Sequence, residues 1–111
     1  MTVDLKDNEK LADLLSGERD NKLLLVKFEA SWCRPCKALA PVLEGLAAEW
    51  AEDVDFYALD VDDDPDAANE HQVRSIPTLV LFDEQGAEIG RLTGLNSRGV
   101  IEAFLSDQFE E

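Results

Sequence analysis

A nearly continuous apolar run from Leu23 to Ala30 is the feature that most constrains how this chain can fold. Apolar runs without alternating polar residues are typical of a strand that is covered on both faces. Such strands lie in sheets with helices packed on either side, so we expect an α/β fold. Lys27 is the one oddity in the run, since a buried lysine must either be paired or be pushed towards its neutral form.

Apolar periodicity and turn residues divide the rest of the chain into alternating strands and helices. The expected strands are Val3 to Leu5, Leu23 to Ala30, Val54 to Val61, Ile76 to Phe82 and Ala87 to Thr93. The expected helices are one capped by Asp7 and ended by Gly17, and those over Cys33 to Trp50, Pro65 to Gln72 and Ser97 to Phe109. The first three strands alternate with helices and should be parallel, whereas the last two should form an antiparallel hairpin. We therefore expect a single domain over residues 1–111, with a mixed five-stranded sheet and about four helices on its two faces.

The charge of the chain argues against two classes of partner. Twenty-five acidic against ten basic residues give a formal net charge of -15, which should repel nucleic acids and anionic lipid surfaces. Apolar runs such as Leu23 to Val26 are far too short to span a bilayer, so no membrane partner is expected. Residues 1–7 contain no basic segment followed by an apolar stretch, which makes a cytoplasmic location the expectation.

Both cysteines of the chain, Cys33 and Cys36, are separated by two residues. A tetrahedral zinc site needs four ligands, and besides these thiols the chain offers only His71, which we expect at the surface, and carboxylates. The acidic stretch Asp60 to Asp66 lacks the glycine and distal glutamate of a calcium loop, and is expected to be a solvated turn that starts a helix. A structural disulfide is also a poor explanation, because so short a loop removes little entropy from the unfolded chain. A redox pair explains the spacing best, and neither a metal nor a bound cofactor is expected.

The position of the pair predicts different roles for the two thiols. Cys33 falls between the buried strand and the next helix, where free backbone N–H groups and the helix dipole favour an anion. It is therefore expected to supply a nucleophilic thiolate near neutral pH. Cys36 follows one turn later on the same helix, and is placed to attack the Cys33 sulfur once a mixed disulfide has formed.

Several segments resemble the thioredoxin family, in the same order and across nearly the whole chain. Trp32 to Lys37, with the sequence Trp-Cys-Arg-Pro-Cys-Lys, resembles the family's Trp-Cys-Gly-Pro-Cys-Lys motif. Pro41 stands where thioredoxins have a helix-kinking proline. Ser75 to Thr78 resembles the segment that carries a cis-proline packed against the disulfide, and Thr93 to Leu95 resembles a glycine-centred loop that helps to hold the substrate. The resemblance implies a thioredoxin fold.

The resemblance also implies a function, namely a general protein disulfide reductase that is itself reduced by a flavoprotein, the NADPH-dependent thioredoxin reductase. Cys33 would be the attacking cysteine and Cys36 the resolving one, in a protein expected to be a monomer. A shallow apolar rim and backbone edge for substrate polypeptides would be formed by Trp32, Ile76, Pro77 and Gly94. Two alternatives stay open: a more oxidising disulfide oxidase or isomerase, and a thioredoxin-fold binding subunit or chaperone with incidental cysteines.

Lys27 is the first of two departures from the family that bear on mechanism. Thioredoxins usually carry a buried aspartate six residues before the first cysteine, and Lys27 stands at that position. We expect it to lie beneath the active site as a further catalytic residue, with Glu29 or Asp60 as its partner. As a cation it would favour the Cys36 thiolate, and as a neutral amine it could accept the Cys36 proton. The alternative is a buried stem whose charged head reaches solvent.

Arg34 is the second departure, since it replaces the glycine of most thioredoxins beside the attacking sulfur. Its charge should stabilise the Cys33 thiolate and hence the reduced form. Arg34 and a charged Lys27 are therefore both expected to raise the reduction potential. Together with Glu29 and Pro35, Arg34 is expected to tune the active site.

Overall fold

The computed structural model describes residues 3–4, 11–16 and 21–109. Its strands are β1 (Val3–Asp4), β2 (Leu23–Glu29), β3 (Val54–Asp60), β4 (Thr78–Phe82) and β5 (Glu88–Thr93). Its helices are α1 (Leu11–Ser16), α2 (Arg34–Glu49), α3 (Pro65–Glu70) and α4 (Arg98–Ser106). In this part of the chain, no helix has the length and apolar character needed to cross a membrane.

The strands form one mixed sheet in the order β1-β3-β2-β4-β5. β1 and β2 both run parallel to β3, whereas β4 is antiparallel to its neighbours β2 and β5. In the middle of β2, Lys27 lies opposite Ala58 of β3 and Leu79 of β4. The carboxyl ends of β2 and β3 meet at one edge of the sheet, where Glu29 lies opposite Asp60.

The predicted α/β architecture, a mixed sheet between helices, is confirmed. The first strand is shorter than predicted, because β1 has two residues, so the four strands β2 to β5 form the body of the sheet. β4 begins at Thr78 instead of Ile76, directly after Pro77, which has no N–H group to donate to a strand ladder. Parts of the first predicted elements lie outside the described part of the chain, namely Leu5 of the strand, and residues 7–10 and Gly17 of the helix with its caps.

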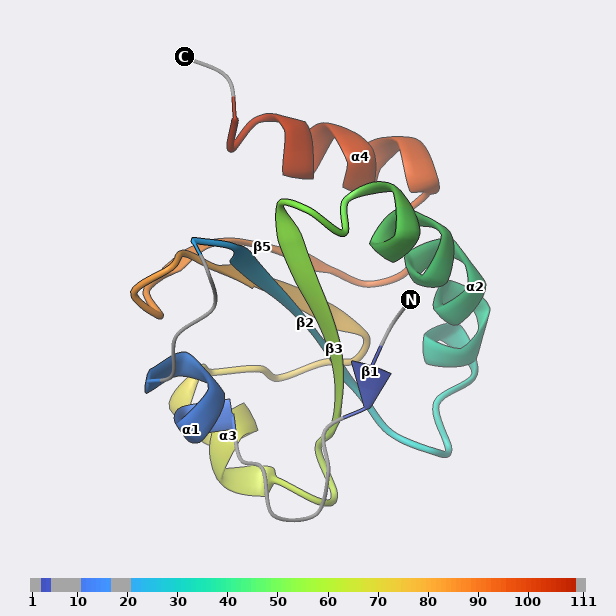
Figure 1. The fold of residues 1–111 in the computed structure, drawn as a ribbon. Coiled ribbons are helices and arrows are strands. Elements are labelled where there is room, and N and C mark those ends of the chain that lie inside the picture. Colours follow the sequence, from blue (N-terminus) through green and yellow to red (C-terminus); the bar gives the residue numbers. More distant parts are fainter. Residues whose placement is uncertain (1–2, 5–10, 17–20, 110–111) are drawn as a thin grey trace.

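Two apolar cores lie on opposite faces of the sheet, one under α2 and α4 and the other against α1 and α3 (Figure 1). Successive side chains of β2 alternate between them, as expected for a strand. Leu23 and Leu25 join the core under α2, and Leu24, Val26 and Phe28 join the opposite core. Lys27 continues the first of these two series, so its side chain enters the layer beneath α2.

The long helix α2 rests on the sheet through apolar side chains at helical spacing, and it contains Pro41. Cys33 is its N-cap and Trp50 its C-cap, which agrees with the predicted span. At its far end the helix is joined to α4 by the ion pair between Arg98 and Glu49. This packing fixes the first turn of α2, and the cysteines in it, above the carboxyl end of β2. The buried side chains of α2 are Cys36, Leu39, Leu43, Leu46 and Ala47.

Candidate active site

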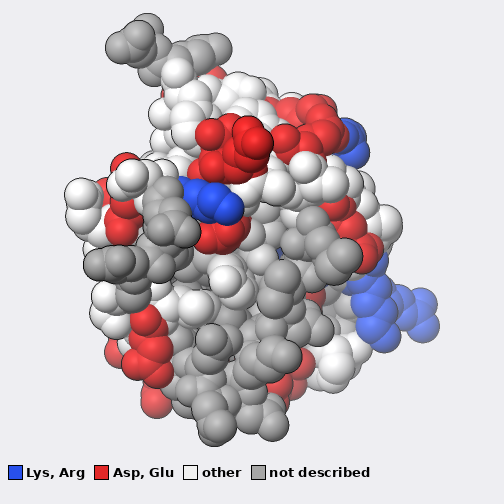
Figure 2. All heavy atoms as spheres, in the orientation of Figure 1, with Lys and Arg blue, Asp and Glu red and all other residues white. Residues whose placement is uncertain are grey.

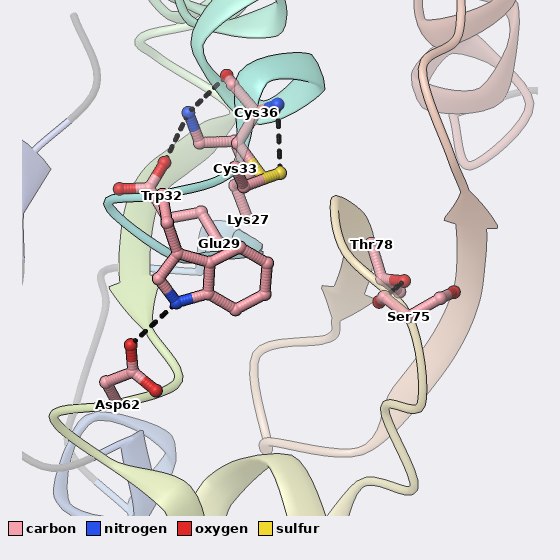
Figure 3. Close-up of a disulfide and its surroundings, with 8 residues drawn as sticks. All are labelled: Lys27, Glu29, Trp32, Cys33, Cys36, Asp62, Ser75 and Thr78. Carbon is pink, nitrogen blue, oxygen red and sulfur yellow. Dashed lines mark hydrogen bonds and ion pairs between the residues drawn. A yellow bond between two sulfur atoms is a disulfide. The ribbon is translucent and has the colours of Figure 1, made fainter.

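Cys33 and Cys36 form a disulfide where β2 passes into α2 (Figure 3). Cys33 is the N-cap of α2 and has an extended backbone conformation. The backbone N–H of Cys36 donates a hydrogen bond to the Cys33 Sγ at 3.2 Å. A helix begins here because Pro35, whose ring fixes a helical φ, stands in the first turn, where its missing N–H is not needed. The N-terminal N–H groups and the dipole of α2 are thus directed at the Cys33 sulfur, which favours negative charge on it.

The two cysteines differ in how far they are covered. Cys33 is 5% exposed and Cys36 is 1% exposed. Both pack with Ala30, and the half-buried side chains of Val61 and Ile76 lie against this small cluster. An incoming disulfide can therefore reach the Cys33 sulfur first, while Cys36 is placed to act only within the protein.

The segment before β4 contacts the cysteine cluster through Ile76. The peptide bond between Ile76 and Pro77 is cis, and Pro77 is buried. The Thr78 hydroxyl donates to the Ser75 carbonyl at 2.7 Å, which closes the turn around the proline. The cis-proline that the resemblance implied is present, and Ile76 is the residue of this turn that packs against the cysteines.

Gly94 is linked directly to the proline turn. Its backbone N–H donates to the Pro77 carbonyl at 2.8 Å. The glycine has a φ of 88°, in the left-handed region that residues with a Cβ rarely adopt. Gly94 is half-buried, and the neighbouring Leu95 is exposed. The predicted rim residues from both loops thus lie at the same edge of the sheet as the disulfide.

Trp32 is the most exposed large apolar side chain among the described residues, at 68%. Its indole Nε1 donates to Asp62 Oδ2 at 3.0 Å, which holds the ring across the loop that follows β3 (Figure 3). Asp60 in turn accepts a hydrogen bond from the Asp62 backbone N–H at 2.8 Å. Asp62 was not singled out in the sequence, because no local pattern marks a hydrogen bond between two loops 30 residues apart.

Lys27 is 4% exposed, and its Nζ lies 2.6 Å from Glu29 Oε1. The same Nζ donates to the backbone carbonyl of Cys36 at 3.4 Å. Figure 3 shows both contacts beneath the first turn of α2. Among the two predicted partners Glu29 is therefore the one that binds Lys27, and Asp60 is occupied with the Asp62 backbone. The charged head stays beneath the helix, which disagrees with the alternative of a head that reaches solvent.

A pocket of about 330 Å³ opens beside this ion pair. It contains two cationic and two anionic side chains, so its charges balance. Lys37 and Glu44 of α2 were not singled out in the sequence. Glu44 lies eight residues after Cys36, a helical spacing that places both on one face and could have predicted it. The lining residues are Lys27, Glu29, Ala30, Ser31, Cys36, Lys37, Ala40, Glu44 and Ala58.

Arg34 and Pro35 are exposed on the first turn of α2, as is Lys37. Figure 2 shows acidic side chains spread over much of the visible face and basic ones in a few separate places, one of them at the edge where α2 begins in Figure 1. Two exposed cationic side chains thus stand on the helix turn that carries the disulfide of a strongly acidic chain. Positive charge at this place favours a thiolate on the neighbouring sulfur.

The acidic stretch after β3 forms the predicted turn and helix start. Asp64 caps α3 and accepts a hydrogen bond from the Ala67 backbone N–H at 3.3 Å. Within the described residues, no group of three potential metal-ligating side chains comes together. His71, the C-cap of α3, is half-buried, and its ring packs edge-on against Phe82 with 5.1 Å between ring centroids, so part of it stays exposed.

Comparison with known proteins shows which family this chain resembles. A family model described as Thioredoxin matches residues 3–107. The chain is 43% identical over 106 residues to a thioredoxin of Mycobacterium bovis, a match that covers 96% of this chain and 88% of that protein. It is 42% identical over 107 residues to the bifunctional thioredoxin reductase/thioredoxin of Mycobacterium leprae, where the match covers 96% of this chain and 22% of that protein.

A solved structure has the same fold. It comes from work on the thiol-resolving mechanism of a yeast mitochondrial 1-Cys peroxiredoxin via the glutathione and thioredoxin systems, and one of its chains is 33% identical to this one with a TM-score of 0.79. The match covers 96% of this chain and 94% of that chain.

The Cys33–Cys36 disulfide at the start of α2, together with these relatives, identifies a thiol–disulfide oxidoreductase. The chain belongs to the thioredoxin family. Its relatives support a protein-disulfide oxidoreductase, and they favour neither an oxidase or isomerase nor a binding subunit with incidental cysteines.

Proposed function

We propose that the protein is a general protein disulfide reductase of the cytoplasm, active as a monomer and reduced in turn by an NADPH-dependent thioredoxin reductase. The observation that carries this proposal is the disulfide at the N-terminus of α2, in which Cys33 is the more exposed cysteine and its sulfur accepts the Cys36 N–H. No metal and no bound cofactor are needed for this chemistry, because both electrons are carried by the dithiol.

The reaction has two exchange steps. The Cys33 thiolate attacks one sulfur of a substrate disulfide, which forms a mixed disulfide and releases the other substrate sulfur as a thiolate. Cys36 then loses its proton and attacks Cys33 Sγ, which releases the second substrate sulfur and forms the Cys33–Cys36 disulfide. The substrate gains two electrons and the protein loses them; the protein also gives up the Cys36 proton, and the released thiolates take up protons from the solvent. A reductase restores the dithiol by the reverse exchange.

Substrate polypeptide is proposed to dock on the rim around Cys33. Trp32 offers an exposed apolar ring held by Asp62, and Ile76 packs beside the cysteines. The backbone at Pro77 and Gly94 is tied together by a hydrogen bond and forms the adjoining edge. Such a rim recognises exposed backbone and apolar side chains without a deep pocket, which suits a reductase with many substrates.

The charged residues near the disulfide are proposed to set the stability of its reduced form. The Lys27 ammonium lies against the Cys36 backbone, where it favours negative charge at the buried thiol. Arg34 does the same for Cys33 from the exposed side of α2, and Pro35 fixes the turn between them. A partner reductase is supported by the mycobacterial relative whose name joins a thioredoxin reductase to a thioredoxin.

The proposed function is tested by coupling NADPH oxidation to insulin disulfide reduction with a bacterial thioredoxin reductase. The wild-type protein should sustain turnover, and Cys33→Ser should abolish it. Cys36→Ser should accumulate a mixed disulfide with the substrate, which a non-reducing gel resolves. Activity retained in Cys33→Ser would instead indicate a role in which the cysteines are incidental.

A further inference from the structure

The resolving step needs a destination for the Cys36 proton. Cys36 is 1% exposed, so bulk water has little access to its thiol. We propose that the Glu29 carboxylate accepts this proton through the pocket beneath α2, and that Lys27 is the positioning residue that holds the carboxylate there. This inference rests on the proposed function, because it concerns the second exchange step of that reaction.

The pocket gives Cys36 and Glu29 a shared space. Both residues line its volume of about 330 Å³, together with Lys27. The Glu29 side chain is 25% exposed, so a proton that reaches it can leave to solvent. A space of this size holds several water molecules, and one of them can relay a proton between thiol and carboxylate.

Lys27 is the obvious candidate for a base, but its contacts argue against that role. Its Nζ is 2.6 Å from Glu29 Oε1 and also donates to the Cys36 carbonyl. In this ion pair the side chain is an ammonium, which has three donors and no lone pair to receive a further proton. The two contacts instead tie the Glu29 carboxylate to the backbone of Cys36. Lys27 therefore fixes the distance between the proposed donor and the proposed acceptor.

Two other carboxylates lie near the pocket, and the structure favours neither as the acceptor. Glu44 lines the pocket from α2, but eight residues along a helix place its Cα about 12 Å from that of Cys36. Asp60 lies opposite Glu29 in the sheet and accepts the Asp62 backbone N–H. The charged groups that face Glu29 are thus Lys27 on its own strand, Asp60 on β3, and Lys37 and Glu44 on α2.

The proposed step balances as follows. The S–H bond of Cys36 breaks, its proton passes to Glu29, and the sulfur electron pair forms the bond to Cys33 Sγ. The mixed disulfide bond breaks at the same time, and the substrate sulfur leaves with that electron pair as a thiolate. Glu29 then releases the proton to water through the exposed side of the pocket, so the carboxylate is regenerated.

The experiment follows the reduced protein with Ellman's reagent, dithiobis(nitrobenzoic acid), in a stopped-flow instrument. The first nitrothiobenzoate release reports attack by Cys33 and depends on reagent concentration. The second release reports attack by Cys36 on the mixed disulfide, and its rate does not depend on reagent concentration. Glu29→Gln removes the base but keeps an oxygen that can accept from the Lys27 ammonium, so the fold is expected to persist.

Glu29→Gln should slow the second release by about tenfold or more at pH 7. Loss of a general base typically slows a reaction by about 100-fold or more, and a smaller effect is expected here because water in the pocket still takes some protons. The deficit should close as pH rises, while the first release stays unchanged. Glu44→Gln, the matched control from the same pocket, should leave both releases within about twofold of wild type, as it removes no group from the proposed step. Glu29→Asp should recover part of the loss.

An unchanged second release and pH profile in Glu29→Gln overturns the proposal, as does an equal deficit in Glu44→Gln. Failure of the proposed function would look different, because the wild-type protein itself would then not reduce insulin.

Discussion

The Nζ of Lys27 lies 2.6 Å from the Oε1 of Glu29, and this ion pair sits beneath the helix turn that carries the redox disulfide. The two residues are neighbours on one face of β2, so the alternation of a strand brings them together. The buried position that usually holds an aspartate in thioredoxins thus carries a cation here, and the carboxylate stands two residues further along the strand.

Lys27→Met should slow disulfide exchange while leaving the fold intact. The variant removes the charge beside Cys36, so the exchange rate at pH 7 should fall by up to about tenfold and its pH profile should shift upwards. The free energy of unfolding should fall, because Glu29 loses its cationic partner, but by less than the roughly 3 to 5 kcal/mol of a broken fully buried pair, since the Glu29 side chain is 25% exposed. Stopped-flow exchange and urea unfolding measure the two effects.

Lys22→Met is the matched control for Lys27→Met. Lys22 pairs with Asp55 at 3.7 Å and precedes the amino end of β2, away from the disulfide. Its removal should leave the exchange rate unchanged. If Lys27→Met also leaves the rate and its pH profile unchanged, Lys27 has no functional role.

Arg34→Gly should lower the reduction potential. The arginine is exposed and stabilises the Cys33 thiolate from the surface, so its loss weakens the reduced form. A surface charge contributes a fraction of 1 kcal/mol, which corresponds to a decrease of about 5 to 20 mV for a two-electron couple. Equilibration with glutathione buffers at low salt measures the shift, which should shrink in high salt. A higher potential in the variant would contradict this role.

Asp62→Ala should weaken the binding of protein substrates. Asp62 accepts the hydrogen bond of the Trp32 indole, so its loss frees the exposed ring of the proposed rim. One such hydrogen bond contributes about 0.5 to 1.5 kcal/mol, so KM for insulin should rise by about two- to tenfold. Exchange with small disulfides, which need no rim, should not change. Asp66→Ala, an exposed carboxylate of α3, should leave KM as in wild type.

Gly86→Ala should destabilise the fold more than any other single alanine at a described glycine. Gly86 has a φ of 87°, and an added Cβ would lie 2.7 Å from the Leu15 carbonyl oxygen. The left-handed conformation alone costs about 1 to 2 kcal/mol, and the contact with backbone adds to this cost. Gly94→Ala, with a φ of 88° and open space around it, isolates the conformational part. Equal losses in the two variants would show that the contact with Leu15 is relieved.

The acid limb of the stability profile should include a contribution from Glu88. The hydrogen bond from Arg91, aided by its charge and opposed by partial burial, lowers the pKa of Glu88 below its ordinary value of 4.5. Because the folded-state pKa is the lower one, the stabilisation is present above pH 4.5 and is lost as pH falls through the folded-state pKa. Glu88→Gln should therefore flatten the fall in unfolding free energy below pH 4.5. Glu84→Gln is the exposed control, and a flattening of equal size there would exclude the pair as its cause.

The sequence predicted the elements that carry the redox chemistry because their signals are local. An apolar run that ends in a Cys-x-x-Cys pair fixed the position of the disulfide at a strand–helix junction. The alternation of β2 placed Lys27 and Glu29 on the same face, so their pairing could be proposed from spacing alone. The start of β4 was less accurate, because a strand pattern at Ile76 does not show where Pro77 interrupts the ladder.

Contacts between distant segments were not predictable in the same way. The hydrogen bond between Trp32 and Asp62 depends on how two loops meet at one edge of the sheet, and no local pattern marks it. The packing of the His71 ring on Phe82 was not predicted either, because it depends on where the short helix α3 ends relative to the sheet. Glu44 is the exception, because its spacing from Cys36 along one face of α2 could have predicted its place in the pocket.

The equilibrium reduction potential of the Cys33–Cys36 couple tests the central claim most directly. Glutathione buffers of known ratio, with the fraction of disulfide measured by thiol alkylation, give this value. A protein disulfide reductase of this family should lie within a few tens of mV of about -270 mV, slightly raised by Lys27 and Arg34. A value at or above about -180 mV, the range of protein disulfide isomerase, would contradict the account and indicate a protein that forms or rearranges disulfides.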